Sequence, residues 1–484
     1  MEHTATTTIG TRGPLLAGVP SAVTEAARQV RLAGGLTPRV AVLIALMGIA
    51  FALMYLDVVR AALDGSRTAI MVTVPVLAAL IASGYHTAPR GVTDDESNWI
   101  LAIIAGLVCF GGIELLCDRI PTLTGLWQLR LLGAPIWLAC LMTVLVGVRH
   151  VVQMWPLWVF SLVCGTPLPF LLATAALGGS DTAATAVAAT VGAVAVYLAT
   201  PSLPRLHRGS GAAACLALAA GFVMLFGAPS LFVAIVVVSG VFPVLIVVLM
   251  RHAHGPVPTA LRAPADSMPN VSATALAALL VVAAALPLVY RPAAHPPEPA
   301  PAPTDWARAA VLSAPRSYPF ITRYLGPGAT LQRYAVSPAA GMPAAAVDVI
   351  TTDNPAALDD FRDAVWYPSP DPVSFHPADP ALGAPPGARI AYTNADATTE
   401  HTGQDWYAVT WDWRLPSGMQ RVTVIVSQSI DGQQTPPAPR PFTVHDVSLR
   451  PTLWVARQQP DETGRVDETV LQRAAEVVRA VSGE

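Results

Sequence analysis

The long apolar runs before residue 290 constrain the fold of this chain more than any other feature. The first begins near Val40 and reads AVLIALMGIAFALMYL, and comparable runs recur as far as position 290. A membrane-spanning helix needs about 20 consecutive apolar residues. Charged residues make up 13% of the chain, which is about half the fraction usual in soluble globular proteins. The sequence therefore predicts a polytopic α-helical membrane bundle.

Hydropathy and segment length predict about nine spans within a transmembrane domain at 39–290, after a polar tail at 1–38. The expected spans are 39–58, 68–85, 98–116, 130–148, 155–177, 183–200, 211–227, 229–250 and 272–290. The sixth span is rich in Ala and Thr and is the weakest, so an orientation along the membrane interface is its alternative. A long charged stretch precedes the first span, and we expect no cleavable signal peptide.

Arginine positions predict the orientation, because loops rich in basic residues stay in the cytoplasm. The basic residues are all Arg, and those between the spans include Arg149, Arg205, Arg208, Arg251 and Arg262. With nine spans and a cytoplasmic N-terminus, all of these fall on the cytoplasmic side of the inner (plasma) membrane. The absence of Lys, with much Ala, Pro and Val, is typical of a GC-rich bacterial genome such as that of an actinobacterium.

A Pro/Ala linker at 291–304 separates the spans from a region of different character. Such linkers favour extended, semi-rigid conformations. Residues 305–484 combine polar turns, aromatic residues and short alternating runs, which predicts a soluble α+β domain with its own core. The predicted topology makes this domain extracytoplasmic.

Three elements of that domain can be predicted individually. Residues 354–365 should form a helix with Asn354 as its N-cap. Residues 405–415 and 420–428 alternate in hydropathy and should pair as a hairpin. Residues 466–481 should form an amphipathic helix. The strand residues Tyr407, Val409, Trp411 and Trp413 share one face; a core position is the favoured interpretation, and a surface that binds peptide or glycan is the alternative.

Charged residues near the predicted outer ends of the spans are the first candidates for function. They are Asp57, Arg60, Glu114, Asp118 and Arg119. Interfacial residues that reach toward water explain most of them, whereas Glu114 has apolar neighbours on both sides. The acidic cluster Asp94-Asp95-Glu96 precedes the third span, where it favours helix capping. Transport or glycosyl transfer is the functional alternative for these acids.

The stretch WPLWVFSLVCGTPLPF, at 155–170, is the most unusual part of the bundle. Pro156 fits the first turn of a helix. Pro167 and Pro169 fall inside the fifth span, where each leaves a backbone carbonyl without a partner. Such breaks are tolerated where protein or a polar cavity satisfies those groups. We therefore expect a kink near the outer end of this span, next to a polar cavity.

Trp155, Pro156, Pro167 and Pro169 resemble the central signature of the exosortase/archaeosortase family. The resemblance covers roughly 90–250, and some members of that family likewise carry one more span and an extracytoplasmic domain. It implies a membrane cysteine transpeptidase that cuts sorting signals from exported proteins. By position, the resemblance places the catalytic Cys, Arg and His at Cys215, Arg251 and His254, with His252 as the alternative to His254.

The match departs from the family at several positions. The family's Cys-Ser-Gly reads Cys215-Leu216-Ala217 here, and Val248 stands where the family has Asn. The nine-span topology also places Cys215 and Arg251 toward the cytoplasm. We therefore keep two functional hypotheses: exosortase-like processing of an exported protein or peptide, and a non-enzymatic scaffold or accessory subunit of an envelope export or assembly machine.

The composition and the motifs limit the classes of partner that this chain is expected to bind. The expected partners are membrane lipid and an exported polypeptide. No motif predicts a cofactor or a metal site, and the lack of basic patches argues against nucleic-acid binding. The five cysteines, Cys109, Cys117, Cys140, Cys164 and Cys215, all lie before residue 290. A disulfide framework in the C-terminal domain is thereby excluded.

Overall fold

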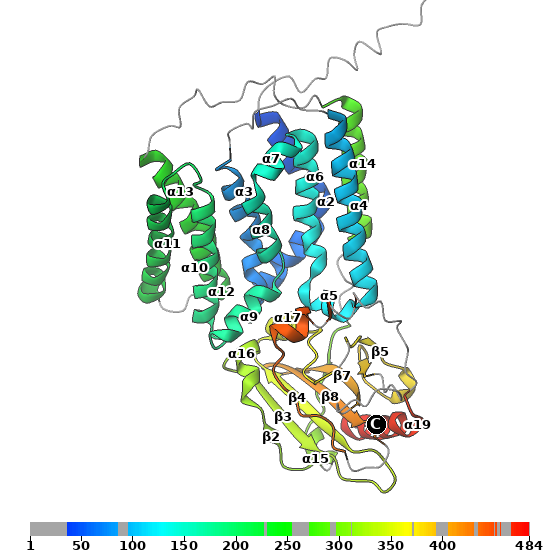
Figure 1. Cartoon of the computed structure of the whole chain (residues 1–484). Helices are drawn as coiled ribbons and strands as arrows, with labels where there is room; N and C mark the ends of the chain where they lie inside the picture. Colours follow the sequence, from blue (N-terminus) through cyan, green and yellow to red (C-terminus); the bar gives the residue numbers. More distant parts are fainter. Residues whose placement is uncertain are drawn as a thin grey trace, which may run out of the picture.

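A computed structural model shows a helical bundle with an α+β domain seated at one of its ends (Figure 1). The structure describes residues 36–85, 95–226, 230–253, 271–290, 297–310, 312–369, 372–393, 405–429, 434–449, 451–452, 455 and 466–483.

Helices occupy every one of the predicted spans. The bundle consists of α2 (Leu36–Leu63), η1 (Arg67–Val72), α3 (Val74–Ala82), α4 (Asp95–Arg119), α5 (Pro121–Trp127), η2 (Leu129–Leu132), α6 (Gly133–Leu145), α7 (Val148–Gln153), α8 (Trp155–Cys164), α9 (Leu168–Ala176), α10 (Asp181–Leu198), α11 (Arg205–Phe226), α12 (Leu231–Ile235), η3 (Val236–Val241), α13 (Phe242–Ala253) and α14 (Ala273–Val289). Within the described chain, 5 helices are long and apolar enough to cross a membrane, or up to 7 if each bent pair is one span. The apolar helical segments Arg67–Ala82 and Ala273–Val289 are shorter.

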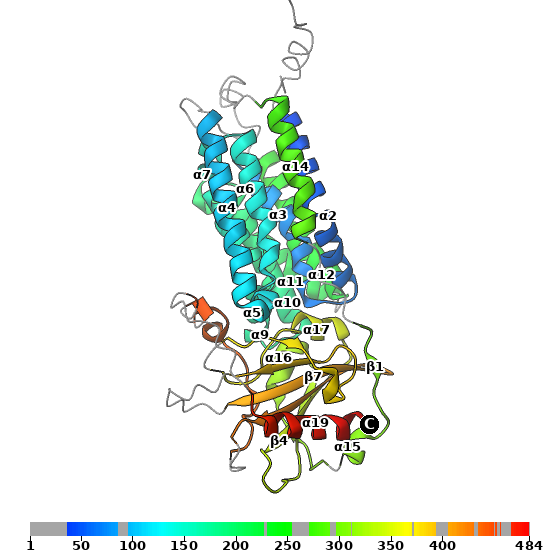
Figure 2. The same cartoon turned by 90° about the vertical axis from the view of Figure 1, so that its right-hand side faces the viewer.

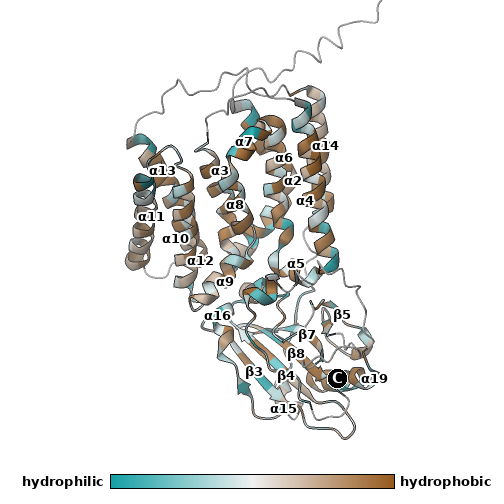
Figure 3. Cartoon of the chain, viewed as in Figure 1, coloured by the Kyte–Doolittle hydropathy of each residue, from teal (hydrophilic) through white to brown (hydrophobic). Residues whose placement is uncertain are grey.

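The surface of the bundle is compatible with lipid. Among the described residues, the exposed large apolar side chains lie on the bundle helices, with Val444 of the C-terminal domain as the exception. Figure 3 shows this contrast as brown helices above a paler domain. Soluble monomers rarely expose apolar patches of this extent. The bundle therefore has the surface of a membrane domain.

Arg149 and Arg251, from two of the predicted cytoplasmic loops, lie at the end of the bundle away from the C-terminal domain. α7, which holds Arg149, and the last turn of α13, which holds Arg251, lie there (Figures 1 and 2). Arg251 donates to the carbonyl of Ala199 at 3.3 Å, so the loop before α11 lies at the same end. The predicted separation of these basic loops from the C-terminal domain is thus present in the fold.

The C-terminal domain is built on an eight-stranded sheet in the order β2-β3-β4-β8-β7-β6-β5, with β1 paired to β7. Its strands are β1 (Ala300–Pro301), β2 (Arg316–Ser317), β3 (Thr330–Ala335), β4 (Ala345–Thr352), β5 (His376–Pro377), β6 (Arg389–Tyr392), β7 (Trp406–Leu415) and β8 (Gly418–Ser427). The neighbours in this order are antiparallel, and β1 is parallel to β7. The helices are α15 (Trp306–Ala309), η6 (Pro319–Ile321), α16 (Thr322–Leu325), α17 (Pro355–Asp360), η7 (Pro380–Leu382), η8 (His445–Leu449) and α19 (Glu468–Ser482).

The predicted hairpin is confirmed as β7 and β8, and the predicted terminal helix as α19. Tyr407, Val409, Trp411 and Trp413 are buried in one core together with the apolar stripe of α19. The core interpretation of these aromatic residues is therefore correct. Their alternation matches the two faces of a strand, and α19 covers the apolar face.

Two predicted boundaries differ from the structure. The helix expected at 354–365 begins where predicted, because Asn354 accepts a hydrogen bond from the backbone N–H of Ala357 at 3.2 Å, but it ends at Asp360. The expected linker at 291–304 includes Ala300, which pairs with Trp413 of β7. The folded domain therefore begins before residue 305, because an edge strand can be short and rich in proline.

Candidate functional site at the junction of the bundle and the C-terminal domain

The proline-rich stretch of the fifth span bends sharply, as predicted. The axes of α8 and α9 differ by 68° across the break between Cys164 and Leu168. Gly165 makes the bend possible, since a Cβ at that position would lie 2.2 Å from the backbone oxygen of Ser161. Pro167 and Pro169 then start the second helix, where a missing N–H costs little. The bend leads α9 to the domain end of the bundle (Figure 1).

A second bent pair lies at the same end. α5 begins at Pro121 and makes an angle of 61° with the helix that continues to Leu145. Gln128, between the two parts, adopts a left-handed conformation with φ of 49°. α5 and α9 together supply most of the bundle surface on which the C-terminal domain is seated (Figures 1 and 2).

One apolar core, here called the junction core, is shared by the bundle and the C-terminal domain. The bundle contributes Leu126, Leu168, Leu171 and Ala175, and the C-terminal domain contributes Tyr324, Leu325, Phe361, Trp366 and Phe442 among others. Full burial of one large apolar side chain stabilises a fold by about 1.5–3 kcal/mol. The contact is thus an extension of the protein interior across the domain boundary.

Arg67 lies at the centre of the polar contacts beside the junction core. Its backbone N–H donates to Asp360 Oδ2 at 2.8 Å, and the Ser66 hydroxyl donates to Asp360 Oδ1 at 2.5 Å. Its guanidinium donates to the backbone oxygen of Tyr324 at 3.3 Å and to Asp181 at 3.4 Å. These contacts, here called the junction latch, tie two loops of the bundle to α16 and α17.

Burial sets the protonation of the latch carboxyl. Removal from water raises the pKa of Asp360 to about 7, and the hydrogen bonds from Ser66 and Arg67 limit this rise. A buried carboxylate is costly unless donors satisfy it. The latch is therefore sensitive to pH near neutrality.

The bundle and the C-terminal domain approach closely, backbone to backbone, at Gly179. Gly179, with φ of +74°, follows α9, and a Cβ there would lie 2.0 Å from the backbone oxygen of Arg323. Its neighbour Gly178, with φ of +98°, has nothing within 4 Å of such an atom. Backbone meets backbone at Gly179, which leaves no flexible atom to move aside.

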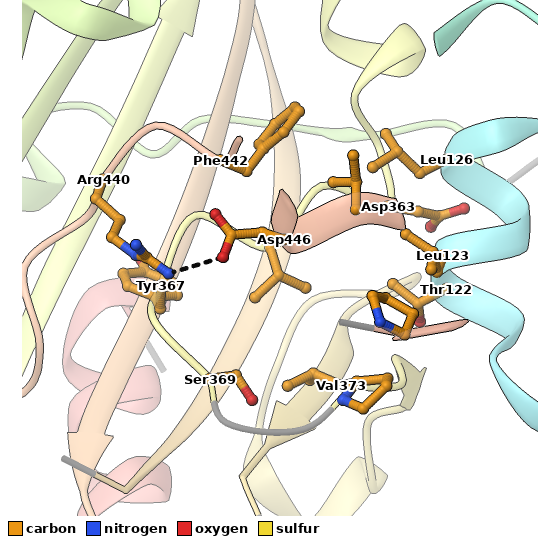
Figure 4. A pocket seen from close by; sticks show the side chains of 14 residues that line it. Thr122, Leu123, Leu126, Asp363, Tyr367, Ser369, Val373, Arg440, Phe442 and Asp446 are labelled. Carbon is orange, nitrogen blue, oxygen red and sulfur yellow. Dashed lines mark hydrogen bonds and ion pairs between the residues drawn. The ribbon is translucent and has the colours of Figure 1, made fainter. Parts of the chain in front are cut away.

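A cavity of about 100 Å³, here called the junction pocket, opens between α5 and the C-terminal domain (Figure 4). Leu123, Leu126, Val365, Val373 and Val447 give it apolar walls. Figure 4 shows Arg440 and Asp446 on one side of it, joined by an ion pair of 3.3 Å, with Asp363 beside the α5 residues. The pocket is mostly apolar and has a few charged groups around it, as small binding sites usually do.

Ion pairs cover the sheet face behind the pocket. Arg421 binds Asp412 through two hydrogen bonds of 2.8 and 3.1 Å, and Arg333 binds Asp348 through two of 2.7 and 2.6 Å. Burial alone would raise the pKa of Asp412, but the adjacent Arg421 guanidinium outweighs burial and lowers it. The Tyr367 hydroxyl, whose residue lines the pocket, donates to Asp348 at 2.6 Å. These pairs fix the wall that supports the pocket.

The resemblance-based site residues lie away from the junction. Cys215 is 0% exposed on α11, among apolar side chains that include Val196, Ile246 and Val247. Arg251 donates to the Ser83 hydroxyl at 2.9 Å. α11 and α13 pack against each other, but Cys215 faces apolar side chains, whereas Arg251 donates to Ser83 and Ala199.

The third member of that set, His254, lies outside the described residues. His252, its alternative, is exposed at the end of α13. Within the described ranges, no group of three or more His, Cys, Asp or Glu side chains is placed to hold a metal ion.

Three of the five charged residues predicted at the outer ends of the spans, Asp57, Arg60 and Glu114, form ion pairs. Asp57 and Arg60 are 3.1 Å apart, and Glu114 and Arg130 are 3.5 Å apart. Glu96 lies in the first turn of α4, where an acidic side chain is favoured by the helix dipole. These contacts support the interfacial interpretation. Asp94, the first acid of the predicted cluster, lies outside the described residues.

Sequence reasoning missed the junction latch. Arg67 directly precedes an apolar run. This position was the one sequence signal that could have marked it as a residue at the end of the bundle. Asp360 has the same sequence context as any acidic residue on a predicted surface helix.

No family model, no curated protein and no solved structure matches this chain.

Proposed function

We propose that this protein is a membrane scaffold or accessory subunit of an envelope export or assembly machine. The observation that carries the proposal is the junction core, which holds a folded domain against the end of an apolar bundle. A scaffold needs a fixed platform, and the core, the latch and the Gly179 contact supply one. The buried position of Cys215 favours this function over thiol catalysis, since a nucleophile must be reached by its substrate.

The proposal includes a topology. Nine spans place the N-terminus and the basic loops in the cytoplasm and the C-terminal domain outside the inner membrane. The clustering of Arg149 and Arg251 at the end opposite that domain supports this orientation.

Purification of the tagged full chain from native membranes tests the scaffold function. An envelope protein should co-purify in a fixed ratio. Gly179→Ala, which disturbs the seated domain, should lower its recovery, whereas Gly178→Ala should retain it. A clean monomer without any envelope partner would contradict the scaffold.

An exosortase-like transpeptidase is the second candidate. The bend at Gly165 in the WPL…PLP stretch favours it, as does the placement of Cys215 and Arg251 on neighbouring helices. In that case His254 would take the proton of the Cys215 thiol, and the sulfur would attack the scissile carbonyl of the sorting signal to form a thioester. The C–N bond would break, the leaving amine would take the proton from His254, and Arg251 would hold the developing oxyanion. Undiminished processing of exported proteins by a Cys215→Ala variant would remove this candidate.

A further inference from the structure

We propose that the junction pocket binds an uncharged polypeptide segment that inserts one apolar side chain between α5 and the C-terminal domain. This inference rests on the proposed scaffold function and names the class of its partner. The size, the charge and the position of the pocket carry it.

The size fits one side chain. The junction pocket has a volume of about 100 Å³. A cavity of roughly 150 Å³ with apolar walls binds benzene, so this smaller pocket fits an aliphatic side chain. An entire lipid acyl chain is too large for it. Single apolar anchors that fill such pockets supply much of the affinity in protein–protein recognition.

The charge around the pocket disfavours an anionic ligand. Two carboxylates, Asp363 and Asp446, and one guanidinium, Arg440, border it. Asp363 also binds Arg389 at 2.7 Å, away from the pocket lining. Each carboxylate is therefore paired with an arginine, and the lining has no excess positive charge to hold a phosphate or a fatty-acid carboxylate. A peptide segment instead offers a backbone carbonyl to Arg440, whose side chain is 44% exposed.

The position of the pocket selects a segment close to the membrane. α5 forms one wall and follows directly on α4, a candidate span. Val444, on the segment that carries Phe442 and Val447 into the pocket, is 60% exposed. An apolar residue beside an apolar pocket extends the surface that a partner can cover. A polypeptide leaving the bilayer next to the bundle would pass this mouth.

Photocrosslinking in the full-length protein tests the proposal. A benzophenone amino acid replaces Val444, which is exposed beside the pocket, and in a control it replaces Arg479 on the exposed side of α19. The probe at 444 should form an adduct with a polypeptide at an apolar residue, identified by mass spectrometry, and the probe at 479 should not.

Variants that fill the pocket then test whether the crosslinked polypeptide binds in the pocket. Leu123→Trp fills it from α5, and Ser369→Trp fills it from the opposite wall. Each should lower the adduct yield by about tenfold, the effect of losing one anchor. Leu177→Trp, at an exposed position outside the lining, should leave the yield unchanged.

The remaining outcomes overturn the proposal in different ways. An adduct with phospholipid alone would make the pocket a lipid site. A partner that co-purifies with the wild-type chain and also with both filled variants would refute the pocket while the scaffold function stands. Failure of any partner to co-purify would refute the scaffold function itself.

Discussion

The backbone N–H of Arg67 donates to Asp360 Oδ2 at 2.8 Å, which joins the start of an apolar bundle segment to a helix of the C-terminal domain. The two residues are 293 positions apart in sequence. The contact makes the seating of the C-terminal domain dependent on one partly buried carboxyl.

Asp360 should give the protein a pH-dependent stability. Burial raises its pKa from 3.8 to about 7. The folded protein therefore holds a proton that the unfolded chain releases, and the free energy of unfolding should fall as pH rises from about 4 to about 7. Denaturant unfolding in detergent at several pH values measures this slope. Asp360→Asn, which cannot ionise, should flatten it in that range; an unchanged slope would show that Asp360 does not titrate there.

Gly179→Ala should weaken the junction. The new Cβ would collide with the backbone oxygen of Arg323, and the residue would also be strained at positive φ. Strain alone costs about 1–3 kcal/mol, and Gly178→Ala carries that cost without the collision. Limited proteolysis should therefore cleave the Gly179→Ala protein faster than the Gly178→Ala protein. Equal rates would mean that the two backbones are not in contact.

Gly165→Ala should alter the bend in the fifth span. Its Cβ would lie 2.2 Å from the Ser161 backbone oxygen, so α9 must shift. Because α9 contributes Leu168 and Leu171 to the junction core, the thermal midpoint of unfolding should fall. Gly111→Ala, with nothing within 4 Å of the added atom, is the matched control and should leave the midpoint near the wild-type value. Similar midpoints for both variants would contradict a tight bend.

Arg421→Met should destabilise the C-terminal domain by about 3–5 kcal/mol, because it leaves Asp412 charged and without its partner. The double variant Arg421→Met/Asp412→Leu should recover more than half of that loss. Tryptophan fluorescence during urea unfolding measures both, since Trp406 and Trp413 are buried in this domain. A double variant no more stable than the single one would mean that the unpaired Asp412 charge is not the cause of the loss.

Cysteine labelling should report the proposed topology. In a chain whose own cysteines are replaced, Val444→Cys should react with a membrane-impermeant maleimide on intact cells. Arg205→Cys should react only after the membrane is opened, because its loop lies at the opposite end of the bundle. Both positions are exposed, so access to solvent does not distinguish them. The reversed labelling pattern would show that the protein has the opposite orientation in the membrane.

The sequence by itself determined the apolar helical segments, the bend at Pro167 and Pro169, the β7–β8 hairpin and α19. Each follows from local physics: hydropathy over one helix, the missing N–H of proline, and alternation along one strand. The family resemblance also identified Cys215 and Arg251 as candidate catalytic residues. In the structure the two side chains have different neighbours and do not contact each other.

Only the tertiary structure decided what the bent helices face. The junction latch and the junction pocket join residues hundreds of positions apart, and neither Arg67 nor Asp360 carries a local pattern that marks its partner. A buried carboxyl and a surface carboxyl look the same in sequence, because burial depends on which elements pack over them. Here, the packing of α5 and α9 against the C-terminal domain determines which side chains are buried at the junction.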